Sequence, residues 1–208
     1  MSADGVSAPF TKGATAVPAE VQRQLLQIAR AAITRQLEPY LPGPDVQPLV
    51  ADWNQPAACF VTLHEADTHR LRGCIGTLEA DLPLPQAVAY FAQQAAFHDP
   101  RFTPLALAEL AATEIEISVL SPLNALRVES EAELLQRLSL GVDGLWLQAG
   151  VHRATFLPQV WQQLPEPQQF VAQLKHKACL SPDSWGQDFR WWRFSVLCFS
   201  DSGLTSVH

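Results

Sequence analysis

The residues best suited to chemistry form a glycine-rich run around a cysteine, Leu71–Gly76. Cys74 follows Gly73 and precedes Gly76 by two residues, and glycines let a ligand or another backbone approach a strand closely. In an extended strand, Arg72, Cys74 and Gly76 share one face. A cation on that face favours the thiolate, the form of cysteine that acts as nucleophile or metal ligand. The run therefore predicts an accessible, reactive thiol.

The same run also has a purely structural interpretation. Cysteine is among the most buried residue types, and Cys74 could simply fill a small slot. Cys59 lies on the strand expected to pair with that of Cys74. A redox pair of the two thiols depends on the register of this hairpin, which the sequence does not give. Both roles of Cys74 stay open at this point.

A second candidate group follows a predicted helix. Asp99 and Arg101 flank Pro100, which stiffens the backbone where an acid and a base are presented together. They could hold an anionic ligand and orient a general base; equally, Asp99 could accept backbone N–H groups at the helix end and pair with Arg101. Arg153, in a second predicted hairpin, would complete an anion pocket with Arg72 and Arg101 if the two hairpins are neighbours.

Other motifs give no support to metal or cofactor chemistry. His64 and His69 stand five residues apart with no third ligand at a metal-like spacing, so we predict no metal site. The four cysteines form no C-x-x-C pair, which predicts reduced thiols rather than a zinc site or a disulfide scaffold. Phosphate-loop, dinucleotide and nucleophile-elbow motifs are missing from the sequence, and we predict no cofactor.

The predicted elements follow the same order in both halves of the chain. Apolar spacing and capping signals predict the helices, and alternating apolar residues predict the strands. The first half reads as a helix over 18–37, a hairpin of 57–63 and 71–77, a helix from residue 84 that ends at 98, a short helix after 103 and a strand over 114–120. The second half reads as a helix over 130–138, a hairpin of 145–149 and 152–156, a helix from 167 and a strand over 189–199. We therefore predict an α+β fold with a duplicated helix–hairpin–helix–strand unit, subdomains 18–125 and 126–200, and flexible tails at 1–17 and 201–208.

Composition excludes several classes of protein. The 208 residues carry a formal net charge of −7, with three lysines against eleven arginines, so bulk nucleic-acid binding is disfavoured. Trp191 and Trp192 stand beside Arg190 and Arg193 as in a base-stacking surface, but strand alternation places one tryptophan on each face and favours packing. No run reaches the roughly 18 apolar residues of a membrane span, so we expect a cytoplasmic protein without membrane contact.

Ordered matches along most of the chain resemble the AMMECR domain family. Besides Leu71–Gly76, they are residues 58–63, 99–102, 109–110, 115–120, 155–160, 177–178 and Trp185. The resemblance implies an α+β fold of two tightly packed subdomains. It also implies the A component of the AmmeMemoRadiSam system, found beside a Memo-type protein and a radical-SAM protein. The sequence departs from the family at Cys179 and Ala154, where glycine is common, and at His98, where an acid is common.

These observations lead to one main hypothesis and two alternatives. The main hypothesis is a cleft around Cys74 that acts on, or binds, a small anionic molecule or a protein, together with the Memo-type and radical-SAM partners. Cys74 would be nucleophile, thiol carrier or ligand contact; Arg72 and Arg101 would hold the anion; Asp99 would orient Arg101 or a proton; and the two glycines would give backbone access. The first alternative is a non-catalytic scaffold or ligand-binding module. The second, a nucleic-acid-associated regulator, requires a local basic patch that outweighs the net charge of −7.

Overall fold

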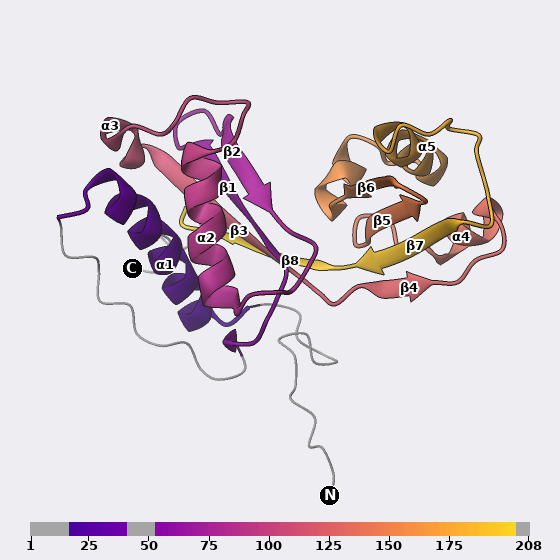
Figure 1. The fold of residues 1–208 in the computed structure, drawn as a ribbon, viewed down its shortest axis with the longest axis horizontal. Helices are drawn as coiled ribbons and strands as arrows, with labels where there is room; N and C mark the ends of the chain where they lie inside the picture. The colour runs from indigo at the N-terminus through magenta and orange to yellow at the C-terminus, as the bar shows by residue number, and fades with distance from the viewer. Residues whose placement is uncertain (1–16, 41–52, 203–208) are drawn as a thin grey trace, which may run out of the picture. The chain divides into compact units, whose positions relative to one another are not determined.

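The protein divides into two compact units, and each unit is built on a four-stranded sheet (Figure 1). A computed structural model describes residues 17–40 and 53–202. The first unit runs to Ser121 and resumes at Leu197, and the second unit is Pro122–Val196. This arrangement confirms the predicted α+β fold. The tails predicted at 1–17 and 201–208 lie almost entirely outside the described residues.

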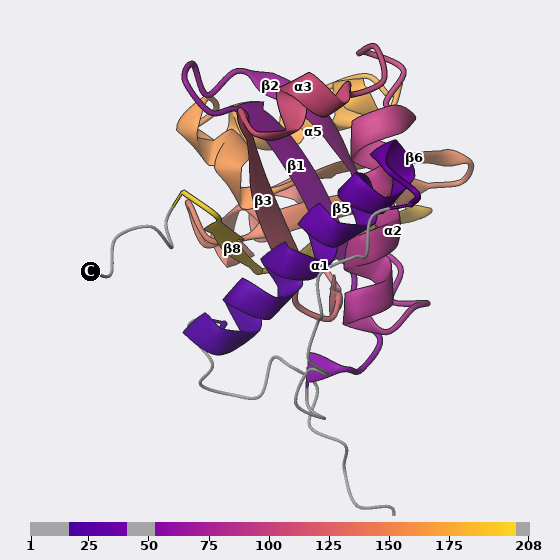
Figure 2. The same ribbon diagram turned by 90° about the vertical axis from the view of Figure 1, so that its left-hand side faces the viewer.

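The first unit packs two helices on one face of its sheet (Figure 2). Its elements are α1 (Ala19–Leu37), β1 (Cys59–Glu65), β2 (Leu71–Gly76), α2 (Leu84–Phe97), α3 (Leu107–Leu110), β3 (Thr113–Leu120) and β8 (Val196–Ser200), with the strand order β2-β1-β3-β8. Alternate residues of β1, namely Cys59, Val61 and Leu63, are completely buried in the core that α1 and α2 cover. Helix α1 forms because Val21, Leu25 and the apolar residues that follow recur once per turn on its buried side.

The second unit encloses a separate core. Its elements are β4 (Asn124–Leu126), α4 (Glu131–Arg137), β5 (Gly144–Ala149), β6 (His152–Phe156), the 3-10 helix η2 (Pro158–Gln162), α5 (Pro167–Lys177) and β7 (Phe189–Phe194), with the strand order β4-β7-β5-β6. Leu145 and Leu147 of β5 are completely buried with Phe170 and Leu174 of α5. Beyond α5, Cys179 has a φ of 60°, a conformation that favours glycine over other residues.

The two units repeat one strand topology, as the duplication predicts. In each unit a hairpin is followed by a strand that pairs antiparallel with the first strand of that hairpin, in β2-β1-β3 and in β6-β5-β7. The fourth strands are exchanged along the chain. β4 follows β3 but pairs with β7, while β8 follows β7 and joins β3.

The single strand predicted over 189–199 is therefore wrong, because the chain passes from one sheet to the other at Ser195. The prediction failed because side chains alternate between the two faces of every strand with a period of two residues. Trp191 points into the core of the second unit, whereas Leu197 and Phe199 pack into the core of the first. All three positions are odd, so the alternation continues through the crossover and hides it.

Gly73 is required by the close approach of β2 to α2. An added Cβ would lie 2.2 Å from the carbonyl oxygen of Ala95. We expect Gly73→Ala to lower the free energy of unfolding by about 1–3 kcal/mol, the usual cost of overpacking, in urea denaturation. Gly150→Asn is the control, because Gly150 has a φ of 58° that asparagine tolerates and nothing lies within 4 Å of the added Cβ. Equal unfolding midpoints for the two variants would contradict this account.

Candidate functional site

Cys74 lies on β2, the edge strand of the first sheet. Gly73 faces α2, so alternation places Cys74 on the opposite face of the sheet. Helices α1 and α2 pack on the face of Gly73 and leave the face of Cys74 uncovered. The hairpin register sets Thr62 of β1 against Cys74, and the Thr62 hydroxyl donates a hydrogen bond to the sulfur at 3.4 Å. The Cys74 side chain is half-buried. The thiol is thus held in place without being sealed in the core.

Asp99 and Arg101 close the outer edge of β2 at Cys74. The backbone N–H of Cys74 donates to Oδ2 of Asp99 at 2.9 Å, and Nη2 of Arg101 donates to the carbonyl oxygen of Cys74 at 3.2 Å. An edge strand exposes such backbone groups to solvent or to another chain. Here both groups of one residue are satisfied by a single pair of side chains, which fixes the backbone that carries the thiol.

The Asp99–Arg101 pair is a two-pronged ion pair. Nε and Nη2 of Arg101 donate to the two carboxylate oxygens of Asp99 at 2.9 and 2.7 Å, a geometry that only the planar guanidinium provides. The hydrogen bond from Arg101 holds the pKa of Asp99 well below its usual range; burial opposes this shift, and the backbone N–H of Cys74 reinforces it. Asp99 thus accepts backbone N–H groups from Cys74 and Arg101 and pairs with the Arg101 guanidinium, the contacts that the structural alternative predicts.

Arg101 keeps part of its cation accessible. The Asp99 side chain is 1% exposed, whereas that of Arg101 is 54% exposed. The hydrogen bond to Asp99 raises the pKa of the Arg101 guanidinium above its usual value; burial acts against it, and the Cys74 side chain adds a smaller increase. Arg101 thus faces Asp99 and Cys74 on one side and solvent on the other. Such a fixed, half-exposed guanidinium next to a thiol can receive an anionic group.

Arg72 is directed away from Cys74 although both lie on the same strand. Its guanidinium donates to both carboxylate oxygens of Glu109 at 3.0 and 3.2 Å and to the carbonyl oxygen of Thr103 at 2.9 Å. The Arg72 side chain is only 11% exposed. Its charge is thus used to hold α3 against the sheet, and Glu109 has a lowered pKa because of the hydrogen bond from Arg72.

The remaining predicted residues serve other contacts. An added Cβ at Gly76 would lie 2.4 Å from the carbonyl oxygen of Cys59, so this glycine permits close approach of β1. Arg153 is exposed on β6 of the second unit. The structure therefore brings together three of the predicted residues, Cys74, Asp99 and Arg101.

Two contacts could not be foreseen from the sequence, the hydrogen bond of Thr62 to Cys74 and the ion pair of Arg72 with Glu109. Thr62 was hidden by the register, which contains an irregularity between Leu63 and His64. Cys59 is completely buried on the opposite face of β1, and burial raises the pKa of its thiol to about 12. Because Thr62 and not Cys59 opposes Cys74, the hairpin does not set the two thiols against each other. Nothing in the sequence signals the pairing of Glu109 with Arg72.

The described residues add two findings on metals and membranes. Within 17–40 and 53–202, no three His, Cys, Asp or Glu side chains are grouped so that they could hold a metal ion. In the same ranges, every helix is too short or too polar to cross a membrane.

Comparisons with known proteins agree with this fold. The family model AMMECR1 matches residues 26–199. The chain belongs to the AMMECR1 family. A Methanocaldococcus jannaschii protein is 34% identical over 184 residues, covering 85% of this chain and 88% of its own, and a Methanothermobacter thermautotrophicus protein is 38% identical over 185 residues, covering 87% and 94%. The crystal structure of an uncharacterised Pyrococcus horikoshii protein has a TM-score of 0.73 and 31% identity, covering 85% of this AMMECR1 protein and 89% of that chain.

The lowered pKa of Asp99 predicts a contribution to stability that depends on pH. Because the folded pKa lies below the unfolded value of about 3.9, this contribution is complete above that value and is lost as the pH falls toward the folded pKa. We expect Asp99→Asn to cost about 2 kcal/mol at pH 7 and to reduce the loss of stability below about pH 4. Urea denaturation across a pH series measures both effects.

Glu20→Gln is the matched control for this prediction. Glu20 pairs with Arg23 on the surface of α1, where both side chains are more than half exposed. Such exposed pairs contribute about 0.5 kcal/mol or less. If Asp99→Asn were no more costly than Glu20→Gln, the Asp99–Arg101 pair would not hold the edge of β2.

Proposed function

We propose that the Cys74 site binds a small anionic group, carried by a small molecule or a protein, and presents a thiol to it. The observation that supports this function is the half-exposed guanidinium of Arg101, fixed by buried Asp99 beside Cys74. Arg101 would hold the anion, Asp99 would orient Arg101, and Cys74 would act as nucleophile, thiol carrier or ligand contact. Arg72 has no part in anion binding in this proposal, because Glu109 already neutralises it.

The proposal extends to partners through the family. AMMECR1 proteins of bacteria and archaea resemble the A component of the AmmeMemoRadiSam system, so this protein would act in the cytoplasm with a Memo-type protein and a radical-SAM protein. In that setting the Cys74 site would bind the molecule on which the three proteins act in common.

Alkylation with two reagents of different charge tests the site. Cys179 is exposed in the second unit and serves as an internal reference. We expect the ratio of the iodoacetate rate to the iodoacetamide rate to be about fivefold higher at Cys74 than at Cys179, since a unit charge near 4 Å contributes about 1 kcal/mol even at the dielectric of water. Mass spectrometry of the digested protein measures the four rates.

Two variants identify the origin of this charge preference. Arg101→Gln should reduce the ratio at Cys74 to the value at Cys179. Arg70→Gln is the control, because it removes an equally charged, largely exposed arginine from the same hairpin and should leave the ratio unchanged. A Cys74 that resists both reagents until the protein unfolds, or that shows no preference for the anionic reagent, would refute the anion-binding thiol.

The edge contacts also favour a second candidate function, a non-catalytic scaffold. Asp99 accepts a hydrogen bond from the backbone N–H of Cys74 and Arg101 donates one to its carbonyl oxygen, and such backbone contacts are what a packing or docking strand requires. In that case Cys74→Ala should lower stability by about 1–2 kcal/mol and leave the activity of the partner proteins unchanged at saturating protein. The thiol site predicts the reverse, a loss of partner activity with an unchanged melting temperature.

A further inference from the structure

The formal charge of the protein is divided unequally between its units. Pro122–Val196 contains seven of the 14 Lys and Arg residues and seven of the 21 Asp and Glu residues, so the second unit is formally neutral. The whole net charge of −7 therefore belongs to the rest of the chain. A basic surface on the second unit therefore has only the seven acidic residues of that unit to oppose it, and not the net charge of −7.

Most arginines of the protein are engaged by carboxylates, but a few are not. Among the described residues, Arg35, Arg127, Arg153 and Arg190 form no ion pair with another described residue, and all four are exposed. Within the described ranges, Arg190 donates to the carbonyl oxygens of Gln187 and Phe189 and to no carboxylate. Three of these four cations belong to the second unit.

The three arginines form one row across the second sheet. The register sets Gln148 of β5 between Arg153 of β6 and Arg190 of β7. β4 ends with Leu126 opposite Trp191, so the next residue, Arg127, follows the strand direction toward Arg190. Strands lie about 4.8 Å apart, and the row therefore spans about 14 Å.

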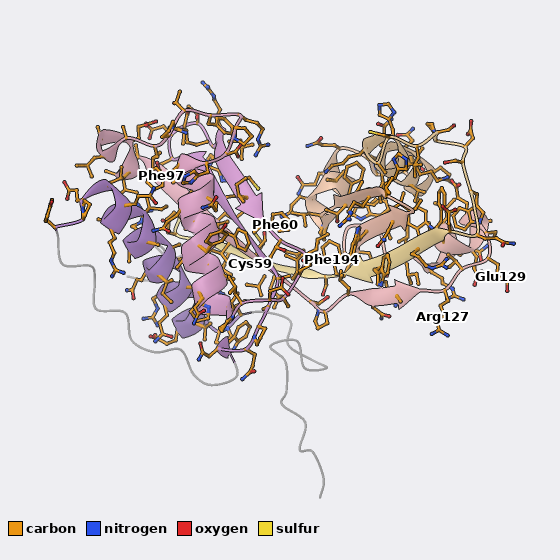
Figure 3. All side chains as sticks on the ribbon, in the orientation of Figure 1. Cys59, Phe60, Phe97, Arg127, Glu129 and Phe194 are labelled. Atoms are coloured by element: carbon orange, nitrogen blue, oxygen red, sulfur yellow. The ribbon has the colours of Figure 1, made fainter. Side chains whose placement is uncertain are left out.

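This row lies on the face of the sheet opposite α5. Leu147 and Ala149 of β5 are buried in the core with α5, so alternation turns Gln148 and its neighbours to the other side. Figure 3, in the orientation of Figure 1, shows the Arg127 side chain extending from β4 away from α5. We call this side of the sheet the arginine face, after Arg127, Arg153 and Arg190.

A stacked tryptophan pair lies in the next row of the arginine face. Trp146 and Trp192 oppose each other on β5 and β7, with ring centroids 4.7 Å apart and an angle of 28° between the rings. Both rings are half-buried. Two residues along a strand correspond to about 7 Å, so the aromatic row runs beside the arginine row within reach of its side chains.

A groove of about 720 Å³ connects the two rows at the β4 edge. Arg127, Arg190 and Trp192 line it, as does Trp191, whose buried indole N–H has no hydrogen-bond partner among the described residues. The groove also contains Glu133, which is neutralised by Arg137, and Glu129. The lining of the groove thus contains three arginines, Arg127, Arg137 and Arg190, against two glutamates, so positive charge is in excess.

We propose that the arginine face binds single-stranded nucleic acid, with phosphates along the arginine row and a base against the Trp146–Trp192 pair. Single strands are bound in this way on other sheets, where aromatic side chains stack on bases and cations follow the backbone. A row of about 14 Å is longer than one phosphate needs, which favours a strand over a free nucleotide. The surface lies in the unit that does not contain Cys74, so this function is independent of the thiol site.

Fluorescence anisotropy with a labelled oligouridine of about 12 nucleotides, a length within the usual range of single-strand sites, tests the proposal on the full-length protein. Three phosphate contacts predict a slope of about −2 for the logarithm of the binding constant against the logarithm of salt concentration. The variant R127Q/R153Q/R190Q should lose most of this slope. The matched variant R23Q/R35Q/R70Q removes the same charge from exposed positions of the first unit and should keep it.

Trp192→Leu separates base stacking from charge. We expect it to weaken binding roughly tenfold while the slope stays unchanged, since stacking on an aromatic ring does not release counterions. Far-UV circular dichroism checks that the sheet is intact, and Cys74→Ser should bind as wild type. The proposal is overturned if the oligonucleotide does not bind, if both triple variants change the slope equally, or if uridine monophosphate competes as well as the oligonucleotide.

Discussion

The ion pair between Asp99 and Arg101 is the interaction on which the candidate site depends. It occupies both backbone groups that Cys74 presents at the open edge of β2, and in doing so it sets the position of the sulfur relative to Thr62. The carboxylate is buried and stays charged because the guanidinium donates to both of its oxygens. One face of Arg101 remains exposed to solvent. The Asp99–Arg101 pair therefore both fixes the backbone of β2 and places a positive charge near Cys74.

The features that could be predicted from the sequence are those carried by local periodicity. The helix at Ala19–Leu37 and the hairpin that contains Cys74 both follow from the spacing of apolar residues. The expected shared face of Arg72 and Cys74 did not follow, because the register is irregular between Leu63 and His64 and the Arg72 side chain turns to Glu109. The partner of each arginine could not be predicted. Arg72 and Arg101 are equally plausible anion binders in the sequence, and only tertiary packing assigns Arg72 to Glu109 and Arg101 to Asp99 and the carbonyl oxygen of Cys74. The crossover at Ser195 was hidden for a related reason, because both sheets use the same alternation.

Net charge is a second property for which the average over the chain hides the distribution between the units. A value of −7 argues against contact with phosphates, yet the acidic excess belongs to the unit that carries Cys74. Arg127, Arg153 and Arg190 are far apart in the sequence, and strand pairing gathers them into one row. Their proximity is a property of the register, which composition and spacing do not reveal.

The return of β8 to the first sheet bears on how such a protein arose and on where its chain can be divided. A cut after Ser121, between β3 and β4, would leave the first product with three of its four strands and β3 as a bare edge, whereas the second product would keep all four strands of its sheet. The first half therefore does not encode the complete sheet of its own unit, although the topology is repeated. In a descendant of a duplicated ancestor, the return of β8 would tie the C-terminal end of the chain to the first unit, and the two units would be inherited, expressed and lost as one.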